Sequence, residues 1–200
     1  MKVTIFKNVF DKKAPHHIPL QQALERIQNG KSSTLVSKVR DGDKTKKQEL
    51  PVVCFSGEFS SRSDEALFEH SGFIILDFDH VDVDATKRAL ATDDFIHSCW
   101  TSPSGQGVKA LVKVTNPERH RDHFRALRTY FHKQYDLEVD ESGINGLAGV
   151  VNMLLKGGAD RDAKTRFGKT PLDWKDAMDD TCESFGMRDL FEGNVRRKHA

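Results

Sequence analysis

The 200-residue sequence is poor in cysteine and has no long run of apolar residues. Its three cysteines, Cys54, Cys99 and Cys182, are an odd number without CxxC spacing, so a reduced protein is the simplest interpretation. The longest apolar runs, FIIL and VVCF, fall far short of the ~20 residues that a membrane helix needs. The opening stretch, MKVTIFKNVFDKKAPHH, has no long apolar region of the signal-peptide type. These absences predict a cytoplasmic protein with no membrane partner.

The sequence also has no excess of charge of either sign. Its 31 lysines and arginines nearly balance 30 aspartates and glutamates, so the net charge says nothing about a nucleic-acid partner, although a local patch can. One basic stretch contains Lys38, Arg40, Lys44, Lys46 and Lys47. We interpret it as a solvated face, with contact to a nucleic-acid backbone as the alternative.

The first 143 residues contain an irregular mixture of strand and helix patterns. Alternating or continuous apolar residues predict strands at about residues 3–10, 51–60, 73–79, 94–102, 107–115 and 137–140. Apolar residues at helical spacing and N-terminal start signals predict helices at about 19–30, 61–72, 84–92 and 116–135, with a loop over most of 31–51. This pattern favours an α+β fold in which helices cover a sheet.

The residue pattern changes after about residue 143. The stretch GLAGVVNMLLKGGADRDAKTRFGKTPLDW, with its GGAD turn and its helix-opening TPLD, resembles an ankyrin repeat over about residues 145–190. A solenoid needs about three repeats to bury its core, so we expect this segment to lean on the first domain or on a protein partner. We therefore divide the chain into a domain at 1–143, an ankyrin-like all-α segment at 144–192 and a basic tail at 193–200.

Two aspartates end the apolar strand predicted at 73–79. Residues i and i+2 of a strand point to the same face, so Asp77 and Asp79 project together. Two like charges this close repel unless a cation lies between them, and oxygen ligands suit Mg²⁺ or Mn²⁺. The alternative is an acidic strand end without a ligand. Asp82 and Asp84 fit better as the cap and first turn of the next helix.

Two further segments can complete such a site. A tight turn of small residues, whose backbone N–H groups can hold a phosphate, precedes Lys109 on the next strand and contains Ser102, Ser104, Gly105 and Gly107. Asp140 ends the short segment LEVD and can supply the third carboxylate of a two-metal phosphoryl-transfer site. The alternatives are an ordinary hairpin turn with a solvated lysine and a turn aspartate.

Other polar residues carry weaker indications. Arg62, in the polar loop SSRSDE, can contact a phosphate or a template strand, although a solvated loop arginine is the more common case. His120 and His123 lie on one face of the helix at 116–135 without a nearby carboxylate or cysteine partner. We therefore interpret both histidines as surface residues rather than zinc ligands.

Three motifs together carry a family resemblance. LPVVCFSGEFSSRSDEALFEHSGFIILDFDHVD, then TSPSGQGVKALVKV, then YFHKQYDLEVDESG resemble the VirE N-terminal-domain family over residues 1–143. That family occurs in bacterial mobile-element and phage-type proteins and is similar to the primase-polymerase (archaeo-eukaryotic primase) superfamily. The resemblance implies a primase-polymerase-like mixed sheet flanked by helices. It implies that Asp77, Asp79 and Asp140 bind metal and that Ser104, Gly105, Gly107 and Lys109 hold nucleotide phosphates. Ser102 and Arg62 are predicted phosphate contacts from their own positions in the turn and in the polar loop.

The function implied by this resemblance is nucleotidyl transfer in DNA replication. Mg²⁺ or Mn²⁺ is the implied cofactor, and nucleoside triphosphates, DNA and a helicase-type replication protein are the implied partners. Two departures favour an alternative, an inactive relative that binds nucleotide or DNA. Lys109 stands where the polymerases usually have His, and the strand expected after the third motif is replaced at DESG by the ankyrin-like pattern. A second alternative is a protein-interaction module that acts through that ankyrin-like segment.

Overall fold

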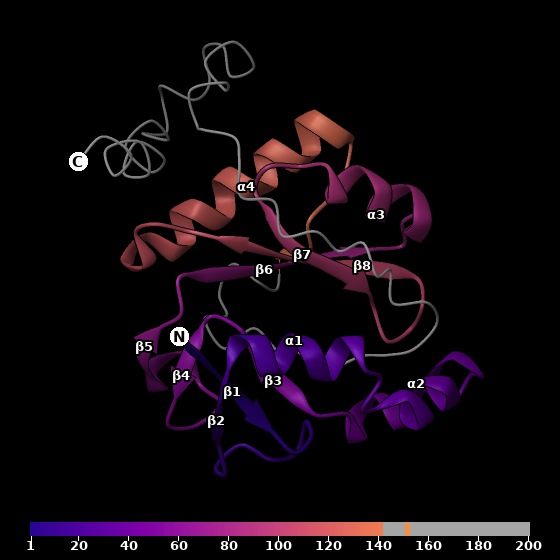
Figure 1. Cartoon of the computed structure of the whole chain (residues 1–200), viewed down its shortest axis with the longest axis vertical. Coiled ribbons are helices and arrows are strands. Elements are labelled where there is room, and N and C mark those ends of the chain that lie inside the picture. Colours follow the sequence, from indigo (N-terminus) through magenta and orange to yellow (C-terminus); the bar gives the residue numbers. More distant parts are fainter. Residues whose placement is uncertain (142–150, 153–200) are drawn as a thin grey trace.

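The computed structural model describes residues 1–141 and 151–152, which form an α+β fold of small antiparallel sheets and a few helices (Figure 1). Every strand pair among these residues is antiparallel. The predicted α+β class is therefore confirmed, but the single mixed sheet is not found. The ankyrin-like segment predicted at 144–192 and the basic tail at 193–200 lie outside the described residues, apart from 151–152.

The N-terminal layer is a four-stranded sheet with helices packed on it. Its strand order is β2-β1-β3-β9, with β1 Lys2–Phe6, β2 His16–Pro19, β3 Val52–Cys54 and β9 Val151–Asn152. Two helices, α1 (Leu20–Gln28) and α2 (Ser33–Arg40), and the 3₁₀ helix η1 (Lys44–Glu49) connect β2 to β3. Helix α2 occupies part of a segment predicted to be a loop, and the buried side chains of Val36 and Val39 explain why it forms there.

A two-stranded sheet follows, made of β4 (Gly57–Phe59) and β5 (Leu67–His70). The helix predicted over 61–72 is wrong, since this segment holds only the 3₁₀ turn η2 (Asp64–Ala66) before β5 begins. The strands approach so closely that a Cβ at Gly57 would collide with the backbone carbonyl of Glu69. Strand pairing with β4 therefore overrides the local helix signal.

The third sheet lies beneath two helices at the other end of the molecule (Figure 1). Its strand order is β6-β8-β7, with β6 Phe73–Asp79, β8 Gly107–Lys113 and β7 Ile96–Thr101. The covering helices are α3 (Val83–Ala91) and α4 (His120–Tyr135), the second preceded by the 3₁₀ turn η3 (Pro117–Arg119). As predicted, Asp82 caps α3, accepting a hydrogen bond from the Ala85 N–H (2.9 Å).

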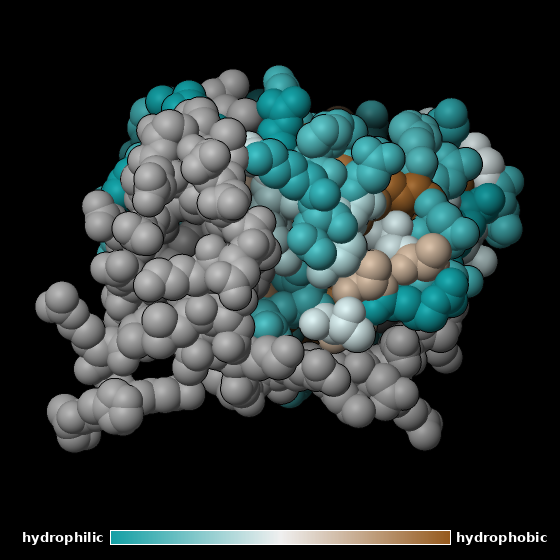
Figure 2. Space-filling view, turned by 90° about the horizontal axis from the view of Figure 1, so that it is seen from above, coloured by the Kyte–Doolittle hydropathy of each residue, from teal (hydrophilic) through white to brown (hydrophobic). Residues whose placement is uncertain are grey.

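The third sheet packs on both of its faces. Ile74, Leu76 and Phe78 share a core with residues of α3 and α4, whereas Phe73 and Ile75 share a core with β1, β3 and α1. The outer surface over α3 and α4 is mainly hydrophilic where described residues reach it (Figure 2). Among the helices that the structure describes, none combines the length and apolarity needed to cross a bilayer.

Candidate functional site

Strand β6 changes character along one of its two faces. Phe73 and Ile75 are buried on the face that looks toward the N-terminal layer, and Asp77 and Asp79 continue that face. Asp77 is half-buried and Asp79 is exposed. The buried apolar residues in the first half of this face therefore fix the strand in the core, and the last two residues of the same face are the two aspartates.

Lys109 lies directly opposite Asp77 on the neighbouring strand. The two residues are paired in the β6–β8 register, and Lys109 Nζ donates a hydrogen bond to Asp77 Oδ2. The Lys109 side chain is only 9% exposed and that of Asp77 is 31% exposed. Asp77 Oδ1 is buried and has no hydrogen-bond partner among the described residues. One carboxylate oxygen is thus neutralised by a lysine while the other is left unsatisfied.

The charges around Asp77 oppose one another. Burial raises the pKa of Asp77, the Lys109 ammonium lowers it, and the Asp79 and Asp140 carboxylates raise it again, leaving it above its ordinary value. A backbone hydrogen bond holds Asp140 beside Asp77: the Asp140 N–H donates to the Asp77 carbonyl (2.9 Å). The segment predicted as a strand at 137–140 is not one, but it still brings the third carboxylate close to the other two.

The small-residue turn lies beside Asp79. Gly107 is paired with Asp79, and a Cβ on it would stand 2.6 Å from the Phe78 carbonyl and 2.9 Å from Asp79 Oδ1. Only glycine fits at this position without moving the carboxylate. Within the turn, the Ser102 N–H donates to the Gly107 carbonyl (2.7 Å), and the Gly105 N–H donates to the Ser102 carbonyl (2.9 Å). These two N–H groups hold the turn in shape rather than pointing to a ligand.

The side chains of this turn also contact one another. Ser102 Oγ and Ser104 Oγ share a hydrogen bond of 2.9 Å, and Ser104 Oγ accepts from the Gln106 N–H at 3.4 Å. Gly105 adopts a positive φ of 79°. Hydrogen bonds within the turn therefore fix its conformation beside Asp79.

One such cation was not predicted as part of the site. The Arg40 side chain, from the end of α2, packs against the turn, since a Cβ on Gly105 would lie 3.4 Å from Arg40 Nε. The sequence placed Arg40 in a basic stretch but gave no signal for this contact. Trp100 of β7 is a second unpredicted neighbour, because it is paired with Lys109 of β8. Its buried Nε1 has no hydrogen-bond partner within the described residues.

Arg62 is not brought to this group. Its Nη2 donates to the Val9 carbonyl, and its backbone N–H donates to the Lys12 carbonyl (3.0 Å). Its guanidinium also acts on the buried Cys54 thiol, whose pKa burial raises to about 12. Arg62 therefore ties the N-terminal loop to the β4–β5 region, away from the carboxylates.

The histidines of α4 form a buried cluster that the sequence did not reveal. His120 is 6% exposed and His123 is fully buried, so the prediction that they are surface residues is wrong. His120 Nδ1 lies 3.1 Å from Nε2 of His70, at the end of β5. Burial lowers the pKa of His120 to about 4, and it also lowers the pKa values of His70 and His123. The apolar face of α4 thus extends into its first turn, where neutral histidines fill it.

No ready-made metal cage accompanies either cluster. Over residues 1–141, no group of three or more His, Cys, Asp or Glu side chains is arranged to hold a metal ion. The Asp79 and Asp140 carboxylates therefore lie close enough to Asp77 to raise its pKa, but the three groups do not converge on one point.

The family model described as BT4734-like, N-terminal domain matches residues 45–144. The chain belongs to this family. The matched part of the BT4734-like domain contains Asp77, Asp79, Lys109 and Asp140, together with the turn beside them. No curated protein and no solved structure matches the chain significantly.

This match corrects the predicted family. The resemblance of residues 1–143 to the VirE N-terminal-domain and primase-polymerase families is wrong, because the family model that matches is the BT4734-like one. The prediction of an ankyrin repeat at 145–190 gains no support from the comparisons either. The three predicted motifs nevertheless meet in space: β8 pairs with β6, and the segment that ends in Asp140 bonds to β6 through its backbone.

Proposed function

We propose that the BT4734-like domain binds a nucleoside triphosphate together with Mg²⁺ or Mn²⁺ on the Asp77–Asp79 face of β6 and transfers its nucleotidyl group. The observation that carries this proposal is the buried Oδ1 of Asp77, which has no partner within the described residues and lies on the same strand face as Asp79. A buried carboxylate oxygen without a partner is costly, and binding a cation removes that cost.

The donor set fits a single hard cation. Mg²⁺ is commonly held by one or two carboxylates, with waters and substrate phosphates completing its shell, so Asp77 and Asp79 suffice without a third ligand. Asp79 is exposed, which leaves room for those waters and phosphates. The absence of a three-residue cage within 1–141 is therefore compatible with this chemistry.

The residues around the carboxylates have distinct tasks in this proposal. A bound divalent ion would polarise the phosphoryl oxygens of the nucleotide. Lys109 neutralises one oxygen of Asp77, and its ammonium would donate to a phosphate oxygen once Asp77 has another partner. Arg40, against the turn at Gly105, adds a guanidinium that matches phosphate geometry. Rate enhancement would come from positioning and charge stabilisation.

A second candidate is nucleotide binding without turnover. The observation that favours it is the contact between Lys109 and Asp77, which leaves one carboxylate oxygen occupied by a resident cation. DNA as the polymer substrate, and a helicase-type replication protein as a partner, remain predictions that rest on the sequence. Of the basic stretch interpreted above as a solvated face, with nucleic-acid contact as the alternative, Arg40 is brought to the turn beside Asp79.

One experiment separates these candidates. The full chain is assayed for incorporation of nucleotides on a primed DNA template with Mn²⁺ or Mg²⁺, and nucleotide binding is measured by calorimetry with and without metal. The test variant is Asp79→Asn, and the matched control is Asp136→Asn, at an exposed left-handed position (φ 54°) that asparagine tolerates.

Each result of this experiment has a clear meaning. Metal-dependent incorporation that Asp79→Asn abolishes and Asp136→Asn preserves supports nucleotidyl transfer. Metal-dependent nucleotide binding without incorporation supports the second candidate. No metal-dependent binding of any nucleotide to the wild-type chain would overturn both.

A further inference from the structure

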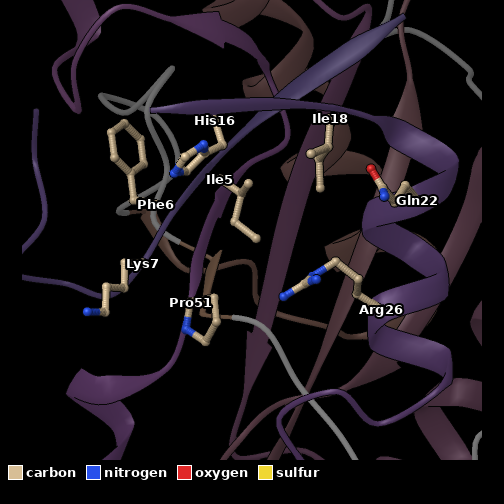
Figure 3. Close-up of a pocket in the computed structure, with 8 residues that line it drawn as sticks. All are labelled: Ile5, Phe6, Lys7, His16, Ile18, Gln22, Arg26 and Pro51. Atoms are coloured by element: carbon tan, nitrogen blue, oxygen red, sulfur yellow. The ribbon is translucent and has the colours of Figure 1, made fainter. Parts of the chain in front are cut away.

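A pocket of about 410 Å³ lies between the β1–β2 hairpin, helix α1 and the residue that precedes β3 (Figure 3). Its apolar walls include Ile5, Ile18 and Pro51, and its polar groups include Lys7, Gln22 and Arg26. None of these residues belongs to the Asp77–Asp79 site. A volume of this size, with mostly apolar walls and a few polar groups, is typical of small-molecule sites.

Arg26 is the group in this pocket that most needs a partner. Its side chain extends from α1, and the guanidinium points toward the middle of the pocket, near Pro51 (Figure 3). Its Nε is buried without a hydrogen-bond partner among the described residues. Buried donors in folded proteins nearly always find an acceptor, and an acceptor carried by a ligand would satisfy this one.

The charges around the pocket have one sign. Lys7 lies on the opposite side of Pro51 from Arg26 (Figure 3), and within the described part of the chain no aspartate or glutamate lines the pocket. His16 also lines it and favours the ionised form of the nearby Asp11 carboxylate. Asp11 is itself engaged by backbone N–H groups of its own loop, including those of Lys7 and Ala14. The Arg26 guanidinium thus points into an apolar hollow whose described lining holds no carboxylate, while the Lys7 side chain lies at its edge with its ammonium directed outward (Figure 3).

We propose that this pocket binds a small organic anion, with an apolar body against Ile5, Ile18 and Pro51 and a carboxylate or phosphate head on Arg26 and Lys7. The planar guanidinium of arginine matches both kinds of head group in a two-pronged arrangement. Lys7 is exposed, and its flexible side chain would turn from the outward direction seen in Figure 3 to bring a point charge to the head group. The site is independent of the nucleotide site on β6.

The test uses the full chain and simple probes that distinguish the contribution of the ligand's apolar part from that of its anionic group. Benzoate and phenyl phosphate carry both parts, inorganic phosphate carries only the charge, and benzyl alcohol carries only the apolar body. In calorimetric titrations, at least one of the two aromatic anions is expected to bind saturably and at least tenfold more tightly than inorganic phosphate or benzyl alcohol. The tighter-binding of the two aromatic anions shows whether the pocket prefers a carboxylate or a phosphate. In NMR titrations, this anion is expected to shift the amide signals of Ile5, Ile18 and Gln22.

Variants then assign the binding to these residues. Arg26→Gln should weaken binding of the aromatic anion at least tenfold and Lys7→Gln about threefold, while Lys31→Gln, at an exposed lysine outside the pocket, leaves it unchanged. Ile18→Trp fills the pocket without altering charge and should also abolish binding. Asp79→Asn should have no effect, so failure of this proposal is distinguishable from failure of the nucleotide site.

Three results would overturn the proposal. The first is that neither aromatic anion binds the wild-type chain saturably. The second is that Arg26→Gln and Ile18→Trp, each shown to be folded by circular dichroism, bind as the wild type does. The third is that the amide shifts fall away from the β1–β2 hairpin and α1.

Discussion

The two faces of strand β6 are built for different purposes. On one face, Ile74, Leu76 and Phe78 are buried along the whole strand under α3 and α4. On the other, Phe73 and Ile75 are buried, but Asp77 and Asp79 follow them toward the same end of the strand. The apolar face holds β6 in place, and the mixed face uses that fixed strand to present carboxylates. Of the seven residues of β6, those of one face are buried along the whole strand, whereas those of the other face are buried only in its first half and end in two carboxylates.

The largest expected effect comes from damaging the apolar face. Phe78→Ala removes a fully buried ring that packs edge-on against Phe131 (centroids 5.5 Å apart), and it should lower the free energy of unfolding by about 3–5 kcal/mol. Asp79→Ala, one residue away on the exposed end of the other face, should change it by no more than about 0.5 kcal/mol. Urea unfolding followed by circular dichroism measures both. Equal losses for the two variants would contradict the division between the faces.

The second effect concerns the buried histidine cluster at the start of α4 at low pH. His120 has a folded pKa of about 4, below its ordinary value of 6.5, so its neutral form is the one that the fold favours. This contribution to stability is complete above about pH 6.5 and is lost as the pH falls toward 4, on the order of 3 kcal/mol for this group.

The matched variant for this effect is His120→Gln, whose side-chain oxygen can still accept a hydrogen bond from His70 Nε2. The loss of stability between pH 7 and pH 4 should be about 3 kcal/mol smaller in His120→Gln than in the wild type. Urea titrations at a series of pH values give this difference. Parallel pH profiles for the two proteins would show that His120 does not titrate as proposed.

The third effect tests the charge balance on the mixed face. Lys109→Met removes the cation that lowers the pKa of Asp77, so that pKa should rise further above 3.8. A folded pKa above the unfolded one means that Asp77 contributes its full stability below pH 3.8 and loses it as the pH rises through the folded pKa. Lys109→Met should steepen this loss and should cost about 1–3 kcal/mol at pH 7.

Carbon-detected NMR of the Asp77 carboxyl measures its midpoint directly. The double variant Asp77→Asn/Lys109→Met is the control, because it removes the titrating group and should remove the added pH dependence. A midpoint that does not move in Lys109→Met would show that the lysine does not act on Asp77.

The smallest expected effect is on nucleotide binding, and it compares an arginine beside the proposed site with an arginine away from it. Arg40→Gln should weaken nucleotide binding about threefold to tenfold, roughly 0.6–1.4 kcal/mol, because Arg40 lies against the turn beside Asp79. Arg62→Gln should leave nucleotide binding within about twofold of the wild type, because Arg62 is held by Val9 and Lys12 instead. Calorimetry in the presence of Mn²⁺ compares them, and a larger effect at Arg62 would reverse the assignment.

Local patterns predicted much of the fold and part of this site. The apolar run that ends in Asp77 and Asp79 is visible in the sequence, and the period of a strand places both carboxylates on one face. The pairing of Asp77 with Lys109 joins residues 32 positions apart, in a sheet whose order β6-β8-β7 skips the next strand along the chain. Such register depends on packing between distant segments, which no local pattern contains.

The predictions that failed did so for related reasons. The helix expected over 61–72 gave way to pairing between β4 and β5, and the contact of Arg40 with the turn at Gly105 arises only when α2 docks. His120 and His123 were assigned to the surface because the sequence offers no carboxylate or cysteine partner nearby, and His70, which contacts His120, lies 50 positions away. Each of these features depends on a neighbour that is distant in the sequence.

The most direct test of the nucleotide site is the position of a paramagnetic ion. Mn²⁺ titrated into ¹⁵N-labelled chain with a nucleotide present should broaden first the amide signals of Asp77–Asp79, Gly105–Lys109 and Asp140, because relaxation by Mn²⁺ falls steeply with distance. Asp79→Asn should abolish this pattern, and Asp136→Asn should preserve it. Broadening that begins instead at exposed carboxylates such as Asp84 and Asp94, and that Asp79→Asn does not change, would contradict the assignment of a metal-dependent nucleotide site to the mixed face of β6.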